Sequence, residues 1–100
     1  MKRHGNDLKY RISYHELVVE IDLPKVDKSV LREIYFAIET KLFTAPDIFG
    51  KPLRGTLHGY WSLRVGDYRL AYRIKGQEVK IECIKHRKEI YKELQQRFGR

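Results

Sequence analysis

Several basic and aromatic side chains in the second half of the sequence are of the types needed to cleave a phosphodiester bond in RNA. A guanidinium group is planar and permanently charged, and it stabilises the charge that develops when a 2′-hydroxyl attacks phosphorus. A histidine or a tyrosine can transfer the protons that this reaction moves. The residues concerned are Arg64, Arg69, His86, Arg87 and Tyr91. No well-placed pair of carboxylates and no metal-ligand motif accompanies them, so we expect no metal and no cofactor.

Two predicted β-hairpins determine where these residues lie. Residues 60–65, 68–74 and 78–84 alternate between apolar and polar side chains, which is typical of strands with one buried face. Gly66-Asp67 and Gly76-Gln77 separate the three segments and suit two-residue turns of type II′, which have glycine first. Turns of this length set the strand register, so cross-strand partners can be counted.

The predicted register produces a basic face on the sheet. Arg64 lies opposite Arg69, and like charges in that position are destabilising by up to about 1 kcal/mol. Glu82 falls opposite Ala71 and Ile84 falls opposite Arg69, so no carboxylate is well placed to relieve the repulsion. We therefore expect this face to bind an anion from outside the chain. Its predicted basic residues are Arg64, Arg69, Arg73 and Lys80.

The segment after the last strand extends the predicted site. Because Ile84 is placed opposite Arg69, residues 85–87 (Lys-His-Arg) should emerge beside it. Tyr91 follows Arg87 by four residues and would share its helical face. The alternative is that Tyr91 is a packing residue and His86 a polar residue at a strand end. Convergence is expected for Arg64, Arg69, His86, Arg87 and Tyr91.

The remaining pattern predicts an α+β domain over residues 1–100 with helices on one face of a small antiparallel sheet. Apolar spacing, glycines and prolines predict a strand over 10–14, a helix over 16–23 ended by Pro24, a helix from 28 to about 44 capped by Asp27, a loop over 45–59 and a last helix over about 88–98. The predicted order is therefore β-α-α-β-β-β-α.

Charge and composition narrow the class of protein. Lys and Arg number 21 against 13 Asp and Glu, giving a net charge of +8. Residues 1–50 are balanced, so the whole excess lies in residues 51–100. This asymmetry favours an anionic partner such as nucleic acid, while a basic surface kept for solubility is the alternative. One cysteine, Cys83, excludes an internal disulfide, and residues 1–7 lack the apolar stretch of a signal peptide, so we expect a cytoplasmic protein.

Three segments carry a resemblance to a known family. They are residues 51–55 (Lys-Pro-Leu-Arg-Gly), residues 61–72 (Trp-Ser-Leu-Arg-Val-Gly-Asp-Tyr-Arg-Leu-Ala-Tyr) and residues 86–91 (His-Arg-Lys-Glu-Ile-Tyr). Together they resemble the RelE/ParE superfamily of bacterial and archaeal toxins. The resemblance implies the toxin of a type II toxin–antitoxin pair. RelE-like members cleave messenger RNA, commonly on the ribosome, whereas members resembling ParE poison DNA gyrase.

The resemblance also implies roles for particular residues. Arg69, Tyr91 and either Arg87 or Lys85 match RelE-like active positions, and His86 matches a histidine that some members use. The base is therefore Tyr91 or His86. Ser62 and Tyr60 stand where the best-studied RelE-like sequences have lysines, which leaves gyrase inhibition as the alternative function.

We also expect RNA contacts and a protein partner. The resemblance implies a cognate antitoxin, which should be acidic to match the basic face and should offer an amphipathic helix to the apolar grooves of the first half. RNA contacts are expected from Lys51, Arg54, Tyr60, Ser62, Arg73, Lys80, Lys85 and Lys88.

Overall fold

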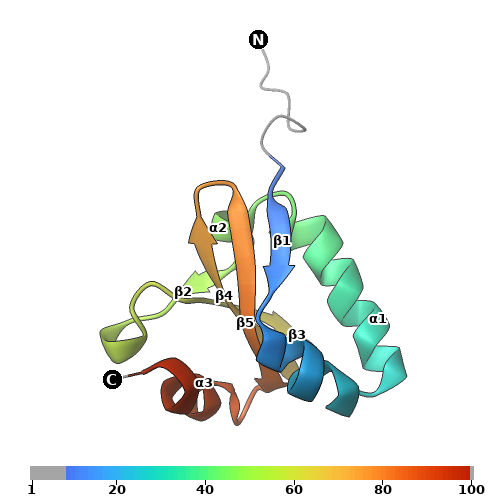
Figure 1. Ribbon diagram of the computed structural model, residues 1–100. Coiled ribbons are helices and arrows are strands. Elements are labelled where there is room, and N and C mark those ends of the chain that lie inside the picture. The colour runs from blue at the N-terminus through green and yellow to red at the C-terminus, as the bar shows by residue number, and fades with distance from the viewer. Residues whose placement is uncertain (1–8, 100) are drawn as a thin grey trace.

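A five-stranded sheet in the order β1-β5-β4-β3-β2 forms the centre of the protein in this computed structural model, which describes residues 9–99 (Figure 1). The strands are β1 (Arg11–Tyr14), β2 (Lys51–Pro52), β3 (Trp61–Val65), β4 (Tyr68–Lys75) and β5 (Glu78–His86). The predicted α+β class is confirmed. The sheet is mixed rather than purely antiparallel, because β1 runs parallel to β5.

The helices differ in detail from those predicted. The main ones are α1 (Lys28–Ala37), α2 (Pro46–Phe49) and α3 (Ile90–Phe98), joined by π-helical segments Val18–Asp22 and Ile38–Leu42 and by 3₁₀ turns Leu23–Lys25 and Gly55–Leu57. Pro24 lies inside a 3₁₀ turn, so helical structure continues to Lys25 instead of ending at the proline. Asp27 takes the N-cap position of α1, but its side chain makes no capping hydrogen bond.

The expected loop over residues 45–59 contains three short elements: α2, β2 and the turn Gly55–Leu57. Pro46 opens α2, where a proline costs nothing because the first helical N–H has no intrahelical partner. The Tyr72 hydroxyl donates a 2.7 Å hydrogen bond to the Pro46 carbonyl and ties α2 to the sheet. The prolines and glycines therefore bound short elements here instead of marking one irregular loop.

Both predicted hairpin turns are present. Gly66 and Gly76 have φ values of 61° and 60°, and no residue other than glycine has a positive φ in the described chain. A type II′ turn requires a positive φ at its first central residue only, which is where both glycines stand. The predicted pairs Arg64–Arg69 and Arg73–Lys80 are confirmed.

A β-bulge in β5 changes the register beyond Tyr72. Ile81 pairs with Tyr72, but Cys83 pairs with Ala71, so that Glu82 is the extra residue. The predictions that Ile84 lies opposite Arg69 and Glu82 opposite Ala71 are therefore wrong. Lys85 pairs with Arg69 and His86 with Tyr68.

Helices cover both faces of the sheet, which corrects the prediction of one covered face (Figure 1). On one face, Leu70 and Ile81 pack with Ile34 of α1 in the larger hydrophobic cluster. On the other, Ala71 and Cys83 pack beneath α3 with its Ile90 and Leu94. Side chains alternate along a strand, so residues that flank Ala71 by two positions emerge beside α3.

No helix within residues 9–99 is long and apolar enough to cross a membrane. The expectation that residues 1–7 do not form a signal peptide lies outside the described residues.

Candidate active site

A three-residue cluster, Ser62, Arg69 and Tyr91, forms where α3 begins to cross the sheet. Arg69 Nη1 donates a hydrogen bond to Ser62 Oγ at 3.0 Å, and the Tyr91 hydroxyl donates to the same oxygen at 3.4 Å. A hydroxyl oxygen has two lone pairs, so Ser62 can accept both. Ser62 is buried, whereas Tyr91 is 37% exposed. The cluster therefore holds a guanidinium group and a phenol side by side at the surface.

Local sequence explains why these three side chains meet. Ser62 on β3 pairs with Ala71 on β4, and Arg69 lies two residues before Ala71, so both side chains project toward α3. Ile90 and Leu94 pack against Ala71 and so form the side of α3 that faces the sheet. Tyr91 follows Ile90 directly and is left at the edge of this contact, facing Ser62.

Arg64 lies opposite Arg69 but its guanidinium group is turned away. Its Nε donates a 2.8 Å hydrogen bond to the carbonyl of Gly66 in the β3–β4 turn. Arg87 is held at the same turn, because its backbone N–H donates to the Asp67 carbonyl at 2.7 Å and its Nε lies 3.8 Å from Asp67 Oδ1. The β3–β4 turn thus holds two of the predicted arginines next to the three-residue cluster.

His86 does not converge with Arg69. It pairs with Tyr68, whose ring packs against the larger hydrophobic core on the α1 side of the sheet. The rings of His86 and Tyr68 meet edge to face, with their centres 6.0 Å apart. Its Nδ1 accepts a 3.2 Å hydrogen bond from the Lys88 N–H. The bulge at Glu82 is the cause, since it reverses the face of every later residue in β5 relative to a regular strand.

Lys85 takes the place on this face that His86 was expected to fill. It pairs with Arg69, and its Nζ lies 3.7 Å from Asp22 Oδ1. Of the two alternatives for a basic residue at the end of β5, Lys85 shares the face of Arg69, while Arg87 lies at the turn.

Asp22 and Arg97, which sequence reasoning missed, fix the position of α3. Arg97 donates from Nη2 and Nη1 to the two Asp22 oxygens at 2.6 and 3.0 Å, and from Nε to Glu93 at 2.9 Å. Asp22 also accepts a 2.9 Å bond from the Ile84 N–H. The hydrogen bond to Asp22 raises the pKa of Arg97 above its already high ordinary value. The available signal was that Asp22 stands between Ile21 and Leu23, and that Arg97 follows Leu94 by three residues, on the apolar side of the helix.

Tyr60 is engaged at the far end of α3. Its ring stacks on Phe98 at 6.1 Å, and the Arg73 guanidinium lies 5.5 Å from the ring centre. Burial, with a smaller effect of the nearby Glu82, raises the pKa of Tyr60. An RNA base could stack on Tyr60 only by displacing one of these neighbours.

Of the other predicted RNA contacts, Lys51 lies beside the cluster. Lys51 of β2 pairs with Ser62 and therefore projects from the same face. The remaining exposed members of the predicted set are Arg54, Arg73, Lys80 and Lys88. Within residues 9–99, no group of three or more His, Cys, Asp or Glu side chains could hold a metal ion.

Comparisons with known proteins place the chain in a family. The family model for the ParE toxin of the type II toxin–antitoxin system parDE matches residues 14–91. Toxin RelG of Mycobacterium tuberculosis is 36% identical over 73 residues, which cover 71% of this chain and 84% of RelG.

Solved structures show the same fold. The RelBE2 toxin–antitoxin complex of Mycobacterium tuberculosis contains a chain with a TM-score of 0.74 and 33% identity, covering 80% of this chain and 93% of that chain. The RelB–RelE antitoxin–toxin complex of Methanococcus jannaschii gives a TM-score of 0.66 and 25% identity, covering 81% and 96%. The chain therefore belongs to the ParE toxin family of type II toxin–antitoxin systems, within the RelE/ParE superfamily that its sequence resembles.

Proposed function

We propose that the protein is an mRNA endoribonuclease of the RelE type that needs no metal ion. The observation that carries the proposal is that Arg69 and Tyr91 both donate hydrogen bonds to Ser62. This arrangement holds a group that can bind phosphate, Arg69, beside a group that can transfer a proton, Tyr91. Exposed basic side chains around the cluster, Lys51 among them, supply attraction for a polyanion.

The reaction is an internal displacement at phosphorus. The 2′-oxygen forms a bond to phosphorus and loses its proton either to Tyr91 acting as base or, where Tyr91 only orients the hydroxyl, to a water molecule. Arg69 stabilises the charge on the pentacoordinate phosphorus centre through its planar guanidinium group. The bond to the 5′-oxygen breaks and that oxygen takes up a proton from water. The products are a 2′,3′-cyclic phosphate and a 5′-hydroxyl. His86 is the weaker choice of base, because it projects from the opposite face.

The proposed setting is messenger RNA on the ribosome, in the cytoplasm, with inhibition of translation as the result. Resemblance to RelE-like toxins supports this substrate, and the net charge of +8 suits an RNA-rich surface.

Gyrase inhibition without chemistry is the second candidate function. It is favoured by the match to the ParE toxin model and by Tyr60 and Ser62, which occupy positions of lysines in the best-studied RelE-like sequences. Under this alternative, the Arg69–Ser62–Tyr91 contacts would serve only to pack α3.

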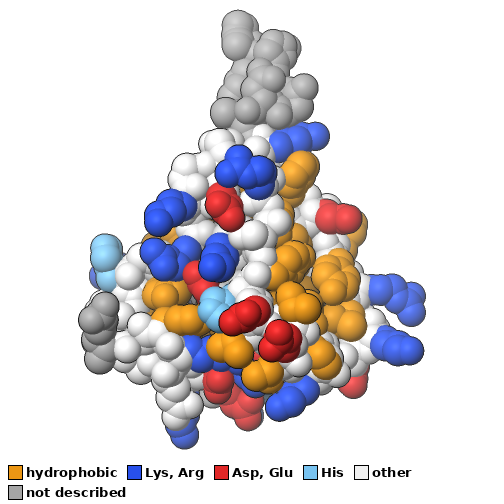
Figure 2. Space-filling model, viewed as in Figure 1, with side chains coloured by type: hydrophobic (Ala, Val, Ile, Leu, Met, Phe, Trp, Pro, Cys, Tyr) orange, Lys and Arg blue, Asp and Glu red, His pale blue; other side chains and the backbone are white. Residues whose placement is uncertain are grey.

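We also propose a cognate acidic antitoxin as partner. The similar solved structures named above are toxin–antitoxin complexes. Hydrophobic side chains gather at the surface between β1 and α1 (Figure 2), where Ile12, Ile38 and Phe43 line a groove together with Glu39. An amphipathic helix of the antitoxin fits such a surface, while its carboxylates would pair with the basic face.

Primer extension on messenger RNA after induction of the protein tests the main proposal. Discrete cuts at positions that depend on the reading frame support cleavage on the ribosome. Loss of these cuts in cells that express Tyr91→Phe would show that they require the Ser62–Arg69–Tyr91 cluster. Intact transcripts together with DNA damage would instead support gyrase inhibition. Cleavage by the purified protein that survives EDTA tests whether a metal ion is needed.

A further inference from the structure

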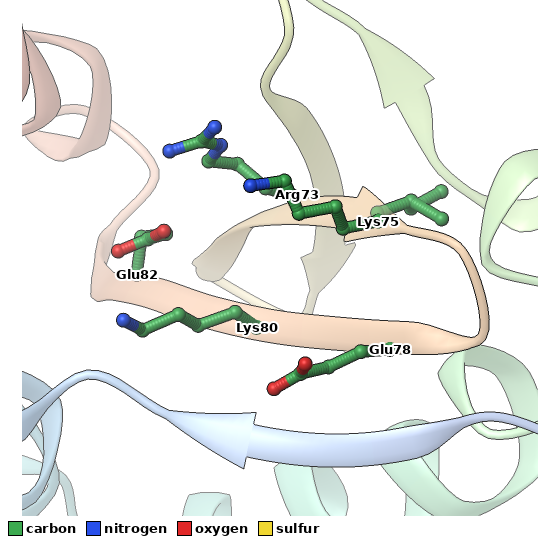
Figure 3. A pocket seen from close by; sticks show the side chains of 6 residues that line it. Arg73, Lys75, Glu78, Lys80 and Glu82 are labelled. Carbon is green, nitrogen blue, oxygen red and sulfur yellow. The ribbon is translucent and has the colours of Figure 1, made fainter.

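A second cavity lies on the basic face, toward the turn end of the β4–β5 hairpin. Its volume is about 280 Å³, and it is lined by Arg73, Ile74, Lys75, Glu78, Lys80 and Glu82. Figure 3 shows Arg73 and Lys75 extending from β4 and Lys80 from β5 toward the end of the cavity where Glu82 lies. The cavity therefore brings three cations and two carboxylates, Glu78 and Glu82, together from two strands.

The three cations have no counter-ion in the described part of the chain. Arg73, Lys75 and Lys80 form no ion pair there, although Arg73 and Lys80 are direct cross-strand neighbours that repel each other. Glu78 lies opposite Lys75 but forms no ion pair with it; its carboxylate instead accepts a 2.7 Å hydrogen bond from Ser13 and lies 3.9 Å from Arg11. An external anion would relieve this repulsion.

Glu82 adds a second recognition element. The residue as a whole is 4% exposed, yet it lines the cavity, and no cation lies within ion-pair distance of its carboxylate in the described residues. An ionised carboxylate is only an acceptor of hydrogen bonds, so Glu82 can accept one from a hydroxyl group of a ligand in the cavity. The bulge places it there, since Glu82 is the extra residue of β5.

The cavity is separate from the Ser62–Arg69–Tyr91 cluster but in line with it. Arg73 follows Arg69 by four residues on the same strand and face, a distance of about 13 Å. The contact between Arg73 and Tyr60, which itself stacks on Phe98, restricts the guanidinium group before any ligand arrives.

We propose that this cavity binds one ribonucleotide of an RNA strand, away from the cleaved bond: Arg73, Lys75 and Lys80 hold its phosphate, and Glu82 accepts a hydrogen bond from its ribose 2′-hydroxyl. The 2′-hydroxyl distinguishes RNA from DNA, so the cavity selects RNA. The proposal rests on the proposed ribonuclease function and adds a determinant of its substrate class.

Binding of a fluorescein-labelled 12-nucleotide RNA and of the DNA of the same sequence tests the proposal. All proteins carry Tyr91→Phe so that the RNA stays intact, and anisotropy is measured at several salt concentrations. The parent should bind RNA about tenfold more tightly than DNA, the size of one well-made hydrogen bond to a charged group. Glu82→Met, which keeps the side-chain volume, should remove most of that preference.

Lys80→Gln tests the phosphate contact independently. It should reduce the slope of log affinity against log salt by about 0.7, the value for one phosphate on a single strand. Lys28→Gln is the matched control, because Lys28 is exposed on α1 at the opposite side of the sheet, and it should leave the slope unchanged. Circular dichroism of each variant checks the fold.

Equal affinity of the parent for RNA and DNA, or a preference for RNA that survives Glu82→Met, would overturn the proposal. An unchanged salt slope in Lys80→Gln would also overturn it, and slower antitoxin association in that variant would then assign the cavity to antitoxin carboxylates. If the wild type fails to cleave RNA while these binding results hold, the ribonucleotide site stands and the ribonuclease function fails.

Discussion

Asp22 and Arg97, 75 residues apart, form a buried ion pair in which both carboxylate oxygens accept from one guanidinium group. The pair joins the π-helical segment Val18–Asp22 to the last turn of α3. Since α3 carries Tyr91, the ion pair helps to determine where the proposed catalytic hydroxyl lies. Its two side chains are 0% and 7% exposed, so water contributes little to their stabilisation.

Asp22→Asn should lower the free energy of unfolding by about 3 kcal/mol or more, because it leaves Arg97 buried without its full counter-charge. Urea denaturation of the purified protein measures the change. Arg11→Gln is the matched control: the Arg11–Glu78 pair is exposed and 3.9 Å long, and its loss should cost less than about 1 kcal/mol. Equal losses in the two variants would contradict the role given to Asp22.

Arg69→Ala should reduce the rate of RNA cleavage by about 10²-fold or more, the loss typical of one electrostatic donor in an active site. Arg64→Ala is the control on the neighbouring strand. Because Arg64 donates to the Gly66 carbonyl, its removal should change the rate far less. Single-turnover cleavage by folded, purified variants measures both. A parental rate in Arg69→Ala would place the bound phosphate elsewhere.

Tyr91→Phe keeps the ring and removes the hydroxyl, so it isolates proton transfer from packing. The cleavage rate should fall by about 10²- to 10⁴-fold. His86→Gln should be the milder change, since His86 lies on the α1 side of the sheet. The opposite order would make His86 the base, and an unchanged rate in both would leave the proposed mechanism without its proton-transfer group.

Gly50→Ala should destabilise the protein by roughly 1–3 kcal/mol through overpacking. A Cβ at Gly50 would overlap the Tyr72 hydroxyl, which is fixed by its hydrogen bond to the Pro46 carbonyl. Thermal unfolding measures the loss. Combining it with Tyr72→Phe should cost less than the two single changes together, because the blocking oxygen is gone. Simple additivity would show that the crowding is not at Tyr72.

Burial raises the pKa of the Cys83 thiol to about 12, well above its ordinary value near 9. The unfolded chain therefore loses this proton at lower pH than the folded chain. The stabilising effect is complete below about pH 9 and is lost as pH rises toward about 12. The free energy of unfolding should thus decline over this range, and the decline should be shallower in Cys83→Ala. Urea titrations from pH 8 to 11 measure it, and parallel curves for the two proteins would refute the assignment.

The hairpins were predictable because their determinants are local. Alternation and a glycine at the first turn position fix the pairs Arg64–Arg69 and Arg73–Lys80, and both are present. The bulge was not predicted: the adjacent apolar residues Cys83 and Ile84 break the alternation, but this break alone does not show whether an extra residue precedes them or the strand ends. The expected position of His86 was wrong for that single reason.

Long-range features were also missed. Asp22 stands between two apolar residues and Arg97 lies on the apolar side of α3, but nothing near either residue indicates the other as its partner. The prediction of a loop over residues 45–59 was wrong for another reason: short elements such as α2 depend on distant contacts such as the Tyr72–Pro46 hydrogen bond. The predicted convergence of Arg69 with Tyr91 is present, because it depends only on the β3–β4 hairpin and on the packing of α3.

The bulge at Glu82 makes β5 unequally sensitive to insertions and deletions. Removing Glu82 would let Cys83 follow Ile81 in regular alternation, so Lys85 would still share a face with Arg69, and His86 with Tyr68. Removing any one residue from 83 to 85 without loss of the bulge would exchange the side chains beyond it between the two faces. Relatives whose sequences differ in length at this strand can therefore carry the same His-Arg dipeptide and present it to opposite sides of the sheet.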